Sequence, residues 1–443
     1  VGYRALEDNT TGSPNTAVGY VALPNNTTGA SNTALGYIAM GDNTTGGSNV
    51  ALGHQALTYN TTASNNTAVG YTAGYSNTTG GSNTAIGDSS LYANTTGTTN
   101  TAVGRRALED NTTGSNHIAM GYGALRNNTT GNDNVALGYL AMDINTTGAS
   151  NVAVGFNALQ ANTTASNNTA VGYQAGLNNT TGTGNNTLGY QSMKSNTTGN
   201  YNTVFGHVAA GLNTAGSDNT VIGSQAMYNN VGSNNTGVGS TALYANTSGN
   251  YSVAVGVQAL RLNTTASANT AVGYRALYSN TTGTFNTSLG SYAGDNISTG
   301  SYNTSLGYNA NPLTPTTSNQ FTLGDGNVGD LRCNDTSISS LSDSRDKTDV
   351  INSPYGLDFI NTVRPVQFKW ETRDGNVKDG STRLGFLAQE LLTAADGNNA
   401  VLNLVLEDNP DRLEAKYGNL LPIAIQAIQE LSAKNDALEA RLA

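Results

Sequence analysis

Asn15-Thr16-Ala17-Val18-Gly19 is the stretch that decides the fold, because it returns every 17 residues. The next copy is Asn32-Thr33-Ala34-Leu35-Gly36, and the series continues to Asn303-Thr304-Ser305-Leu306-Gly307. The closing glycine recurs from Gly2 to Gly324 in steps of 17 residues, with one step of 16 between Gly223 and Gly239. A short fixed period of this kind is typical of a solenoid.

The composition narrows the function classes. The chain has 443 residues, 53 glycines, 11% charged residues and a formal net charge of −10. Low charge is compatible with disorder, but a strict period is not. Without a Lys/Arg cluster, nucleic-acid binding is not expected. The chain has a single cysteine, Cys333, which excludes an internal disulfide and a cysteine-based metal site. It contains no run of 18 apolar residues, so the sequence predicts no membrane-spanning helix. We expect no metal and no cofactor. The chain opens inside a repeat, so we expect Val1 to be the edge of a fragment.

Each repeat predicts one coil of β-structure. The consensus Asn-Thr-Ala-Val-Gly-Tyr-x-Ala-Leu-x-x-Asn-Thr-Thr-Gly-x-x holds two apolar runs, which we interpret as two strands, with Ala22-Leu23 in the second. In Thr16-Ala17-Val18, alternation places consensus positions 2 and 4 on one face, which we assign to the interior. Asn-Thr-Thr-Gly predicts a turn in which Asn hydrogen-bonds the backbone and Gly permits a positive φ. The sequence therefore predicts an all-β parallel solenoid over residues 1–324.

A coil of 17 residues is thin, so we expect three chains to associate along the long axis and bury a second face. Asn49-Val50-Ala51-Leu52-Gly53 and Ser252-Val253-Ala254-Val255-Gly256 resemble the Ser-Val-Ala-Ile-Gly repeat of trimeric autotransporter adhesin heads, although the period here is longer. The resemblance implies a left-handed parallel β-roll in a homotrimer. An interwound triple β-helix is the alternative. The β-roll predicts that Gly19 stacks on Gly36 of the same chain, whereas the triple helix predicts neighbours from other chains.

Tyrosine occupies position 6 in about half of the repeats, as at Tyr20 and Tyr37. We interpret this row as a stack of rings that stabilises the sheet edge, and a glycan-binding surface is the alternative. His54 and His207 fall in the same row and are interpreted as ladder substitutions rather than metal ligands. The Asn-Thr-Thr triplets match the N-glycosylation sequon, but a turn copied with its repeat explains them without sugar.

The repeat stops after Gly324, and charged and aromatic residues become frequent. We assign residues 325–341 to a junction and residues 342–443 to a small α+β domain. The predicted elements are a helix near 355–363, a strand at 365–370, a turn at Arg373-Asp374-Gly375, a strand running into a helix at 383–390, and a hairpin from 402–406 and 413–417 around Asn409-Pro410.

The last helix has heptad spacing. Leu421, Ile428, Asn435 and Leu442 alternate with Ala424, Leu431 and Leu438, in steps of three and four residues. This pattern predicts a coiled-coil seam of about three heptads. Asn435 on the seam would set its register and oligomeric state.

The second domain contains four short sequence motifs that follow one another in the same order as in a known protein family. They are Ser342-Asp343-x-Arg345-x-Lys347, Val363-Arg364-Pro365-Val366-x-Phe368-x-Trp370, Leu384-Gly385-Phe386-Leu387-Ala388-Gln389-Glu390, and Tyr417 before Leu421. Residues 342–443 thus resemble the peptidase S74 family, the C-terminal intramolecular chaperones of phage tail fibres and endosialidase tailspikes. The resemblance implies assisted trimerisation followed by self-cleavage.

The resemblance maps the nucleophile onto Ser342, the base onto Lys347 and the cut onto Leu341-Ser342. A lysine can activate a serine hydroxyl if burial lowers its pKa. Ser344 is a competing nucleophile that the motif disfavours, and Asp343 and Arg345 are expected to shape the turn. Any enzymatic activity would be this single self-cleavage by a serine endopeptidase, with no external substrate.

We therefore predict a structural trimeric fibre, a phage tail fibre or receptor-binding adhesin located on the virion or the cell surface. A host-surface glycan or receptor is a candidate partner. The alternatives are a bacterial cell-surface adhesin or an ice-binding solenoid with the same chaperone, and a polysaccharide-degrading tailspike. Adjacent turn threonines such as Thr44-Thr45 differ from the Thr-x-Thr spacing typical of ice binding. Glu7-Asp8 and Glu109-Asp110 look like solvated turn residues rather than paired catalytic carboxylates.

Overall fold

The computed structural model describes residues 1–328, 342–369, 382–407 and 413–442. Contacts divide the chain into two compact units, one comprising residues 1–310 with 318–322 and the other residues 311–317 with 323–443. Each unit is described by itself below. The predicted turn at 373–375 and the Asn409-Pro410 turn lie outside the described residues.

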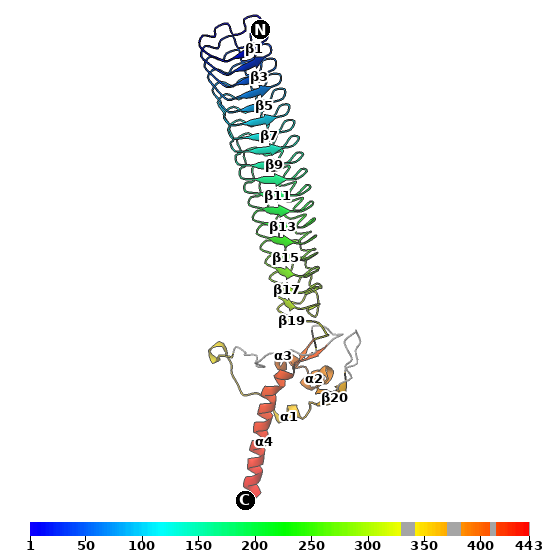
Figure 1. Ribbon diagram of the computed structural model, residues 1–443. Helices are drawn as coiled ribbons and strands as arrows, with labels where there is room; N and C mark the ends of the chain where they lie inside the picture. The colour runs from blue at the N-terminus through cyan, green and yellow to red at the C-terminus, as the bar shows by residue number, and fades with distance from the viewer. Residues whose placement is uncertain (329–341, 370–381, 408–412, 443) are drawn as a thin grey trace. The chain divides into compact units, whose positions relative to one another are not determined.

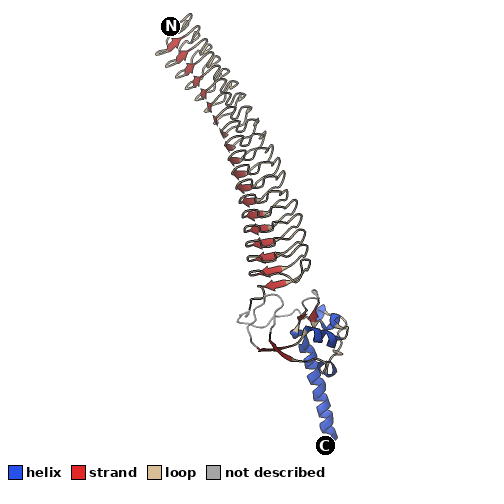
Figure 2. Ribbon diagram, turned by 90° about the vertical axis from the view of Figure 1, so that its right-hand side faces the viewer, coloured by secondary structure: helices blue, strands red, loops and turns tan. Residues whose placement is uncertain are grey.

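The first unit is a parallel β-solenoid, and this part of the predicted fold is confirmed. One three-residue strand per coil contributes to a single 19-stranded sheet, and the strands lie one above another in Figure 1 and form one column in Figure 2. The strands are β1 Thr16–Val18, β2 Thr33–Leu35, β3 Val50–Leu52, β4 Thr67–Val69, β5 Thr84–Ile86, β6 Thr101–Val103, β7 Ile118–Met120, β8 Val135–Leu137, β9 Val152–Val154, β10 Thr169–Val171, β11 Asn186–Leu188, β12 Thr203–Phe205, β13 Thr220–Ile222, β14 Thr236–Val238, β15 Val253–Val255, β16 Thr270–Val272, β17 Thr287–Leu289, β18 Thr304–Leu306 and β19 Phe321–Leu323.

Consecutive coils of one chain stack on each other. Thr16 pairs with Thr33, and the register advances by one repeat per strand, including the 16-residue step from Thr220 to Thr236. A Cβ on Gly19, whose φ is +141°, would lie 2.3 Å from the carbonyl oxygen of Gly36. The closing glycine is therefore required twice, by its positive φ and by the close approach of the next coil. Gly19 on Gly36 is the contact that an intrachain β-roll predicts and an interwound triple helix does not.

The prediction that consensus positions 2 and 4 face the interior is wrong. The middle residue of each strand from β1 to β18, such as Ala34 or Ala51, is buried, whereas Val18 and Leu35, the third residues of β1 and β2, are 39% and 49% exposed. Three side chains per coil fill the interior: this strand alanine, the alanine three residues after the closing glycine, such as Ala22, and the leucine next to it, such as Leu23. A 17-residue coil is so narrow that most strands turn only a methyl group inward, with Val204 and Val221 as buried exceptions, and the larger side chains point out.

The predicted second strand at Ala22-Leu23 is also wrong. This segment is a series of turns in which Val21 and Leu23 both have a φ of +53°. A left-handed residue costs about 1–2 kcal/mol. Hydrogen bonds to both neighbouring coils offset this cost, because Val21 N–H donates to Tyr3 O at 2.8 Å and Leu23 N–H donates to Ala39 O at 2.9 Å. Left-handed residues let the chain reverse within a few positions and close the coil.

The Asn-Thr-Thr-Gly turn is held by a buried ladder of asparagines. Asn43 Nδ2 donates to Asn26 Oδ1 at 2.8 Å and to Gly46 O at 3.0 Å, and the same pair of bonds recurs along the unit. The predicted role of Asn is therefore confirmed. The predicted role of the turn glycine is wrong, since Gly29 and Gly46 are not among the positive-φ residues. The next coil passes close to this position, since a Cβ on Gly29 or Gly46 would lie 2.3 Å from a carbonyl oxygen, and the coils that have alanine here, at Ala63, Ala165 and Ala266, bury it.

The second unit contains short α and β elements and one long helix. The elements are the 3-10 turn η1 Ser344–Asp346, α1 Leu357–Ile360, β20 Val366–Lys369, β21 Thr382–Gly385, α2 Ala388–Ala395, α3 Asn399–Leu402, β22 Val405–Leu406, β23 Glu414–Ala415, the 3-10 turn η2 Tyr417–Asn419 and α4 Leu420–Leu442. The predicted helices, the strand-to-helix segment and the hairpin are confirmed, with β20 antiparallel to β21 and β22 antiparallel to β23. Within the described residues, no helix has the length and apolarity needed to span a membrane.

The core of this unit gathers around the start of α4. Leu391, Leu402, Val405 and Ile423 are buried together. Glu430 Oε2 accepts a hydrogen bond from Leu357 N–H at 2.8 Å, which ties the N-terminus of α1 to α4. That bond lowers the pKa of the Glu430 carboxyl, since a hydrogen bond from a helix N-terminus favours the charged form.

Candidate functional site

The first candidate site is built on η1. Asp343 caps the turn, because its Oδ1 accepts the main-chain N–H of Arg345 at 2.9 Å, and its carboxylate also pairs with the Arg345 guanidinium. The Arg345 side chain, followed by this main-chain bond, lowers the pKa of Asp343. Both residues are committed to the turn, as the sequence predicts.

The turn brings Ser342 and Lys347 together. Lys347 Nζ donates to Ser342 Oγ at 2.5 Å, so the serine hydroxyl is within proton-transfer reach of the amine. Lys347 meets Ser344 through the main chain, where its N–H donates to Ser344 O at 3.3 Å. The geometry thus favours Ser342 over Ser344 as the partner of the amine.

Ser342 and Lys347 are both exposed in this chain. A lysine becomes a base at neutral pH when its ammonium loses its contact with water. The described residues of one chain do not supply that burial. Activation of Lys347 as a base would therefore require burial by groups other than the described residues of one chain.

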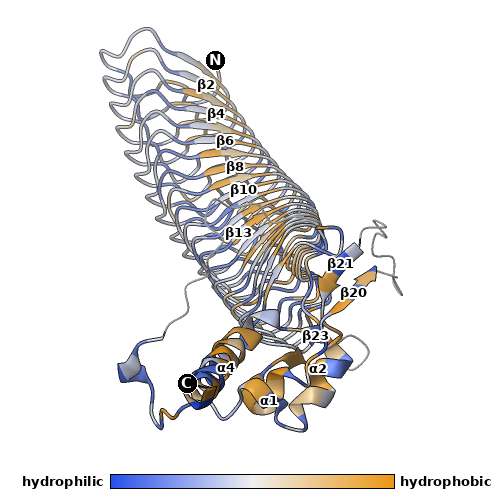
Figure 3. Ribbon diagram, turned by 90° about the horizontal axis from the view of Figure 1, so that it is seen from below, coloured by the Kyte–Doolittle hydropathy of each residue, from blue (hydrophilic) through white to orange (hydrophobic). Residues whose placement is uncertain are grey.

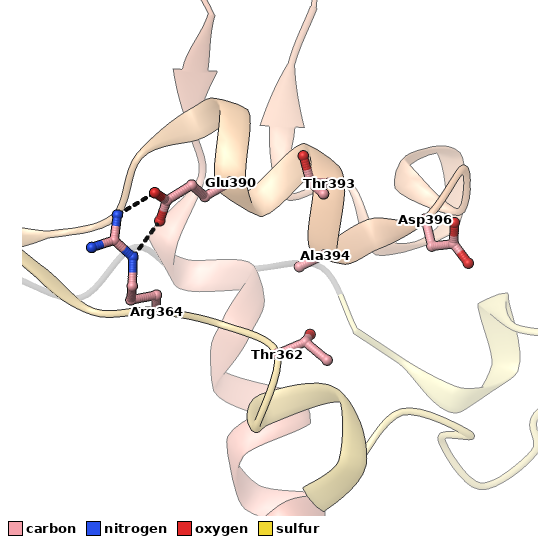
Figure 4. Close-up of a pocket in the computed structure, with 6 residues that line it drawn as sticks. All are labelled: Thr362, Arg364, Glu390, Thr393, Ala394 and Asp396. Carbon is pink, nitrogen blue, oxygen red and sulfur yellow. Dashed lines mark hydrogen bonds and ion pairs between the residues drawn. The ribbon is translucent and has the colours of Figure 1, made fainter.

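An ion pair joins two of the predicted motifs. Arg364, which follows α1, makes a two-pronged contact with Glu390 in the first turn of α2 (Figure 4). Arg364 lowers the pKa of the Glu390 carboxyl, chiefly through this hydrogen bond. The pair lies at one end of an open pocket of about 490 Å³ lined by Thr362, Arg364, Glu390, Thr393, Ala394 and Asp396. Because the guanidinium and the carboxylate are each other's hydrogen-bond partners, we interpret them as a structural ion pair that holds the segment after α1 against α2.

A third contact joins the last two motifs. Tyr417 packs edge-on against Phe386, and its hydroxyl donates to Phe386 O at 3.2 Å. A Cβ on Gly385 would lie 2.8 Å from that hydroxyl, so a larger residue at 385 would displace the tyrosine. Residues that the sequence spreads over positions 364–417 are therefore close neighbours in the fold.

Residues 342–402 match the Peptidase S74 family, the chaperone of endosialidase. The matched residues include the Ser342–Lys347 turn, β20, β21, α2 and α3. No curated protein and no solved structure matches the chain. Together, an S74 chaperone region and a parallel β-solenoid are the make-up of a fibre-like or tailspike-like protein. The match ends at Leu402, so the extension of the S74 region to residue 443 remains a prediction.

The helix that follows the S74 match has two apolar faces. Leu420, Ile423 and Ala427 are buried in the core of the second unit, whereas the predicted seam is exposed, with Ile428 at 63% and Leu442 at 80%. Asn435 donates to Glu439 Oε1 on the same helix at 3.0 Å. The seam therefore has no apolar partner among the described residues.

The tyrosine row of the solenoid forms the predicted ladder. Tyr20 and Tyr37 stack with ring centroids 5.5 Å apart and planes 9° apart, and His54 continues the stack at 4.9 Å from Tyr37. His207 likewise stacks on Tyr190. Stacked rings cover each other's faces, which a sugar ring would otherwise use. No cluster of His, Cys, Asp or Glu able to hold a metal occurs among the described residues.

The sequon asparagines and the turn carboxylates have structural partners. Asn43 and Asn60 are fully buried and bonded on both sides, so a folded coil cannot present them to a glycosylating enzyme. Glu7 and Glu109, which the sequence suggests are simply solvated, form ion pairs with Arg4 and Arg106 of the same coil. Neither pair of neighbouring acids is arranged as two facing carboxylates.

The sequence pattern alone does not point to His117, which is nevertheless buried. His117 takes the place of the consensus Asn before β7 and is fully buried. Its Nδ1 accepts the main-chain N–H of Asn134 at 3.2 Å, as an asparagine Oδ1 does in other coils. The signal was its position: it breaks the first residue of the consensus, where the other coils have Asn, Ser or Gln.

Proposed function

We propose that this chain is the distal part of a trimeric fibre, such as a phage tail fibre or a related surface adhesin, whose C-terminal region brings three chains together. The observation that carries the proposal is the exposed apolar face of the strands. Figure 3 shows hydrophobic colour recurring on the strands of successive coils. Position 4 is aliphatic or aromatic in nearly every coil, and Leu188 and Leu289 are 48% and 53% exposed.

A regular face of this kind restricts its partner. The apolar side chains repeat once per coil, about every 4.8 Å along the solenoid. A partner that covers the whole row must present apolar groups at the same spacing. Another copy of this chain does so, because its strand face has the same repeat. Contiguous apolar surface of this extent is rare on soluble monomers.

The exposed seam of α4 supports the same conclusion independently. Leu421, Ile428, Leu431, Leu438 and Leu442 are all more than half exposed. Heptad seams of this kind are buried by other helices in coiled coils. Two separate elements of one chain therefore both lack an apolar partner that a homotrimer would provide. A location on the virion or cell surface follows from the fibre proposal.

Native mass spectrometry of the full chain tests the trimer. We expect trimers for the unmodified chain and monomers or aggregates for the double variant Ile428→Ser/Leu431→Ser, since it removes two seam residues that the monomer core does not use. Lys434→Ser, an exposed change off the seam, is the matched control and should remain trimeric. A monomeric unmodified chain would refute the fibre proposal.

We also propose that the Ser342–Lys347 pair cleaves the chain at Leu341-Ser342. Ser342 Oγ would attack the carbonyl carbon of Leu341 while Lys347 takes the hydroxyl proton and passes it to the leaving nitrogen of residue 342, and water would hydrolyse the resulting ester. The 2.5 Å contact between Nζ and Oγ supports these roles. Because both groups are exposed in one chain, we expect cleavage only after association covers them.

A denaturing gel of freshly expressed chain tests the cleavage. The unmodified chain should give a fragment ending at residue 341, and Ser342→Ala and Lys347→Met should stay full length. Ser344→Ala is the control because it changes the competing serine of the same turn, and it should still be cut. Full-length chain in every lane would remove Ser342 as a nucleophile and leave the trimerisation proposal standing.

A further inference from the structure

The arginines of the solenoid fall into two groups. Six arginines occur in residues 1–310. Four of them form ion pairs with an acid of the same or a neighbouring coil: Arg4 with Glu7, Arg105 with Asp88, Arg106 with Glu109, and Arg126 with Asp143. Arg261 and Arg275 form no ion pair within the part of the chain that the structure describes, and they are neighbours.

These two arginines share one tyrosine. The Arg275 guanidinium carbon lies 4.2 Å from the centre of the Tyr278 ring and 5.4 Å from that of Tyr292. The Arg261 guanidinium carbon lies 5.8 Å from the Tyr278 ring and 5.6 Å from the Tyr244 ring, and its Nη1 donates to the Tyr278 hydroxyl at 3.0 Å. We call Tyr244, Arg261, Arg275, Tyr278 and Tyr292 the Arg–Tyr cluster.

The cluster holds two like charges without a counterion. Cation–π contacts stabilise the face of each guanidinium, but aromatic rings provide no strong hydrogen-bond acceptor for the N–H groups at its edge. Nε of Arg261 and Nε of Arg275 are both buried and have no hydrogen-bond partner among the described residues. Unsatisfied donors and adjacent like charges both cost stability. Simple packing of arginine stems over tyrosine explains the stacking but not the missing acid, which the other four arginines all have.

We propose that the Arg–Tyr cluster binds an acidic sugar of a surface polysaccharide. The two Nη groups at the end of a guanidinium, rather than the buried Nε, can meet the two oxygens of a carboxylate, and two guanidinium groups beside one ring supply the charge. Tyr274 and Tyr308, which are 43% and 62% exposed and both pack edge-on against Tyr292, offer apolar surface to the C–H face of a pyranose. The inference rests on the proposed fibre function, since it names the class of receptor.

The cluster is placed so that a trimer would leave it open. Its members lie on the turn segment that follows each strand, and Tyr244, Arg261 and Tyr278 occupy the same position in three consecutive coils. The strand face that we assign to the trimer carries the residues of β14 to β17 instead. Association of three chains and binding of a ligand therefore use different rows of the same coils.

Isothermal titration calorimetry of the full-length chain with trigalacturonic acid tests the proposal. Arg261→Gln/Arg275→Gln should weaken binding about tenfold or more, as expected for lost hydrogen bonds between charged groups. These changes are compatible with the fold, because Gln160 and Gln258 occupy the corresponding positions in other coils. The matched control Arg105→Gln/Arg126→Gln removes the same charge elsewhere and should leave the affinity unchanged.

Three further measurements complete the test. The methyl ester of the same trisaccharide has no carboxylates. The unmodified chain should bind this ester no more tightly than the Arg261→Gln/Arg275→Gln variant binds the acid. Arg261→Lys/Arg275→Lys, which keeps the charge, should give an intermediate affinity. Inorganic phosphate should compete only weakly, and tighter binding of phosphate than of the trisaccharide would overturn the carboxylate assignment.

Three results would overturn the proposal. They are equal affinity of the unmodified chain for the ester and the acid, an equal loss of affinity in Arg261→Gln/Arg275→Gln and in the control Arg105→Gln/Arg126→Gln, and no binding of trigalacturonic acid by the unmodified chain. Native mass spectrometry of the same samples distinguishes failure of the sugar-binding proposal from failure of the trimeric-fibre proposal. Trimers without sugar binding would refute the cluster alone, whereas sugar binding by a monomeric chain would refute the fibre proposal and leave the cluster intact.

Discussion

His117 shows how one residue can imitate another inside the solenoid. Its main-chain N–H donates to Asn100 Oδ1 at 3.1 Å, and its ring replaces an asparagine amide: Nδ1 accepts from Asn134 N–H, and the ring also bonds the main chain of Gly131. Because Nδ1 accepts, the neutral ring carries its proton on Nε2, which lies 3.2 Å from Asn128 Nδ2. Burial lowers the pKa of His117 to about 4.

This shift predicts a local loss of stability in acid. As the pH falls below about 6.5, the unfolded chain binds a proton at His117 that the folded coil accepts only near pH 4. The free energy of opening these coils should therefore decrease over that interval, by about 3 kcal/mol in total. His117→Asn has no titrating ring and should abolish the decrease.

Hydrogen exchange of the Asn134 amide at about pH 7.5 and about pH 4.5, corrected for intrinsic rates, measures the effect. His54→Tyr removes a histidine from the exposed ladder and should leave the acid sensitivity of Asn134 in place. Equal protection of this amide in unmodified chain at both pH values would contradict the prediction.

At the same scale, the sequence identifies which residues repeat but not why each is there. The closing glycine is evident from its period alone, and its contact with the next coil follows from stacking. The direction of Val18 and Leu35 is not evident, because alternation fixes only that they share a face. The placement of Ser342 beside Lys347 depended on a family resemblance, since two residues five positions apart carry no such information.

The single strand of each coil explains why alternation predicts the wrong inward face. Hydrophobicity favours burying Val or Leu over Ala, but in most coils the inward position of a three-residue strand holds only the methyl group of an alanine. Val204 tests this account within the chain itself. It takes the inward place of alanine in β12, and Ala210 stands in the same coil where others have Leu or Met. In β13, by contrast, the inward Val221 is buried together with Met227 of the same coil, and a Cβ on Gly237 of the next coil would lie 2.9 Å from Met227, so neighbouring coils share the interior space.

We therefore predict a compensated pair in the coil of β8. Ala136→Val should lower the stability of the solenoid by about 1–3 kcal/mol through overpacking. Met142→Ala, which shortens a buried side chain of the same coil, should relieve most of that cost when the two changes are combined. A double-mutant cycle on thermal unfolding measures the coupling.

Leu137→Thr serves as the control for this cycle. It changes the neighbouring outward position, so it should cost the single coil little and show no coupling to Met142→Ala. Additive effects of Ala136→Val and Met142→Ala would show that the two side chains do not share one space.

For the whole molecule, the repeat creates a problem of register. A trimer of near-identical coils can pair one coil out of step with small local cost. Irregular features are few: the 16-residue step before Gly239, and side chains such as Phe205 in an otherwise aliphatic row. A seam at one end of the chain, where Asn435 breaks the apolar pattern, can fix the alignment before the coils associate.

We therefore predict that the C-terminal region determines register as well as oligomeric state. In a Cys333→Ser background, Leu137→Cys places one cysteine on the strand face of each chain, and in-register trimers should form 137–137 disulfides efficiently. A chain that ends at residue 341 should cross-link poorly, because its coils associate in several alignments. Cross-linking yields on denaturing gels, with Lys194→Cys off the strand face as the control, measure the difference. Equal yields for both lengths would mean that the irregular coils find the register themselves, and the C-terminal region would then be needed only to recruit the three chains.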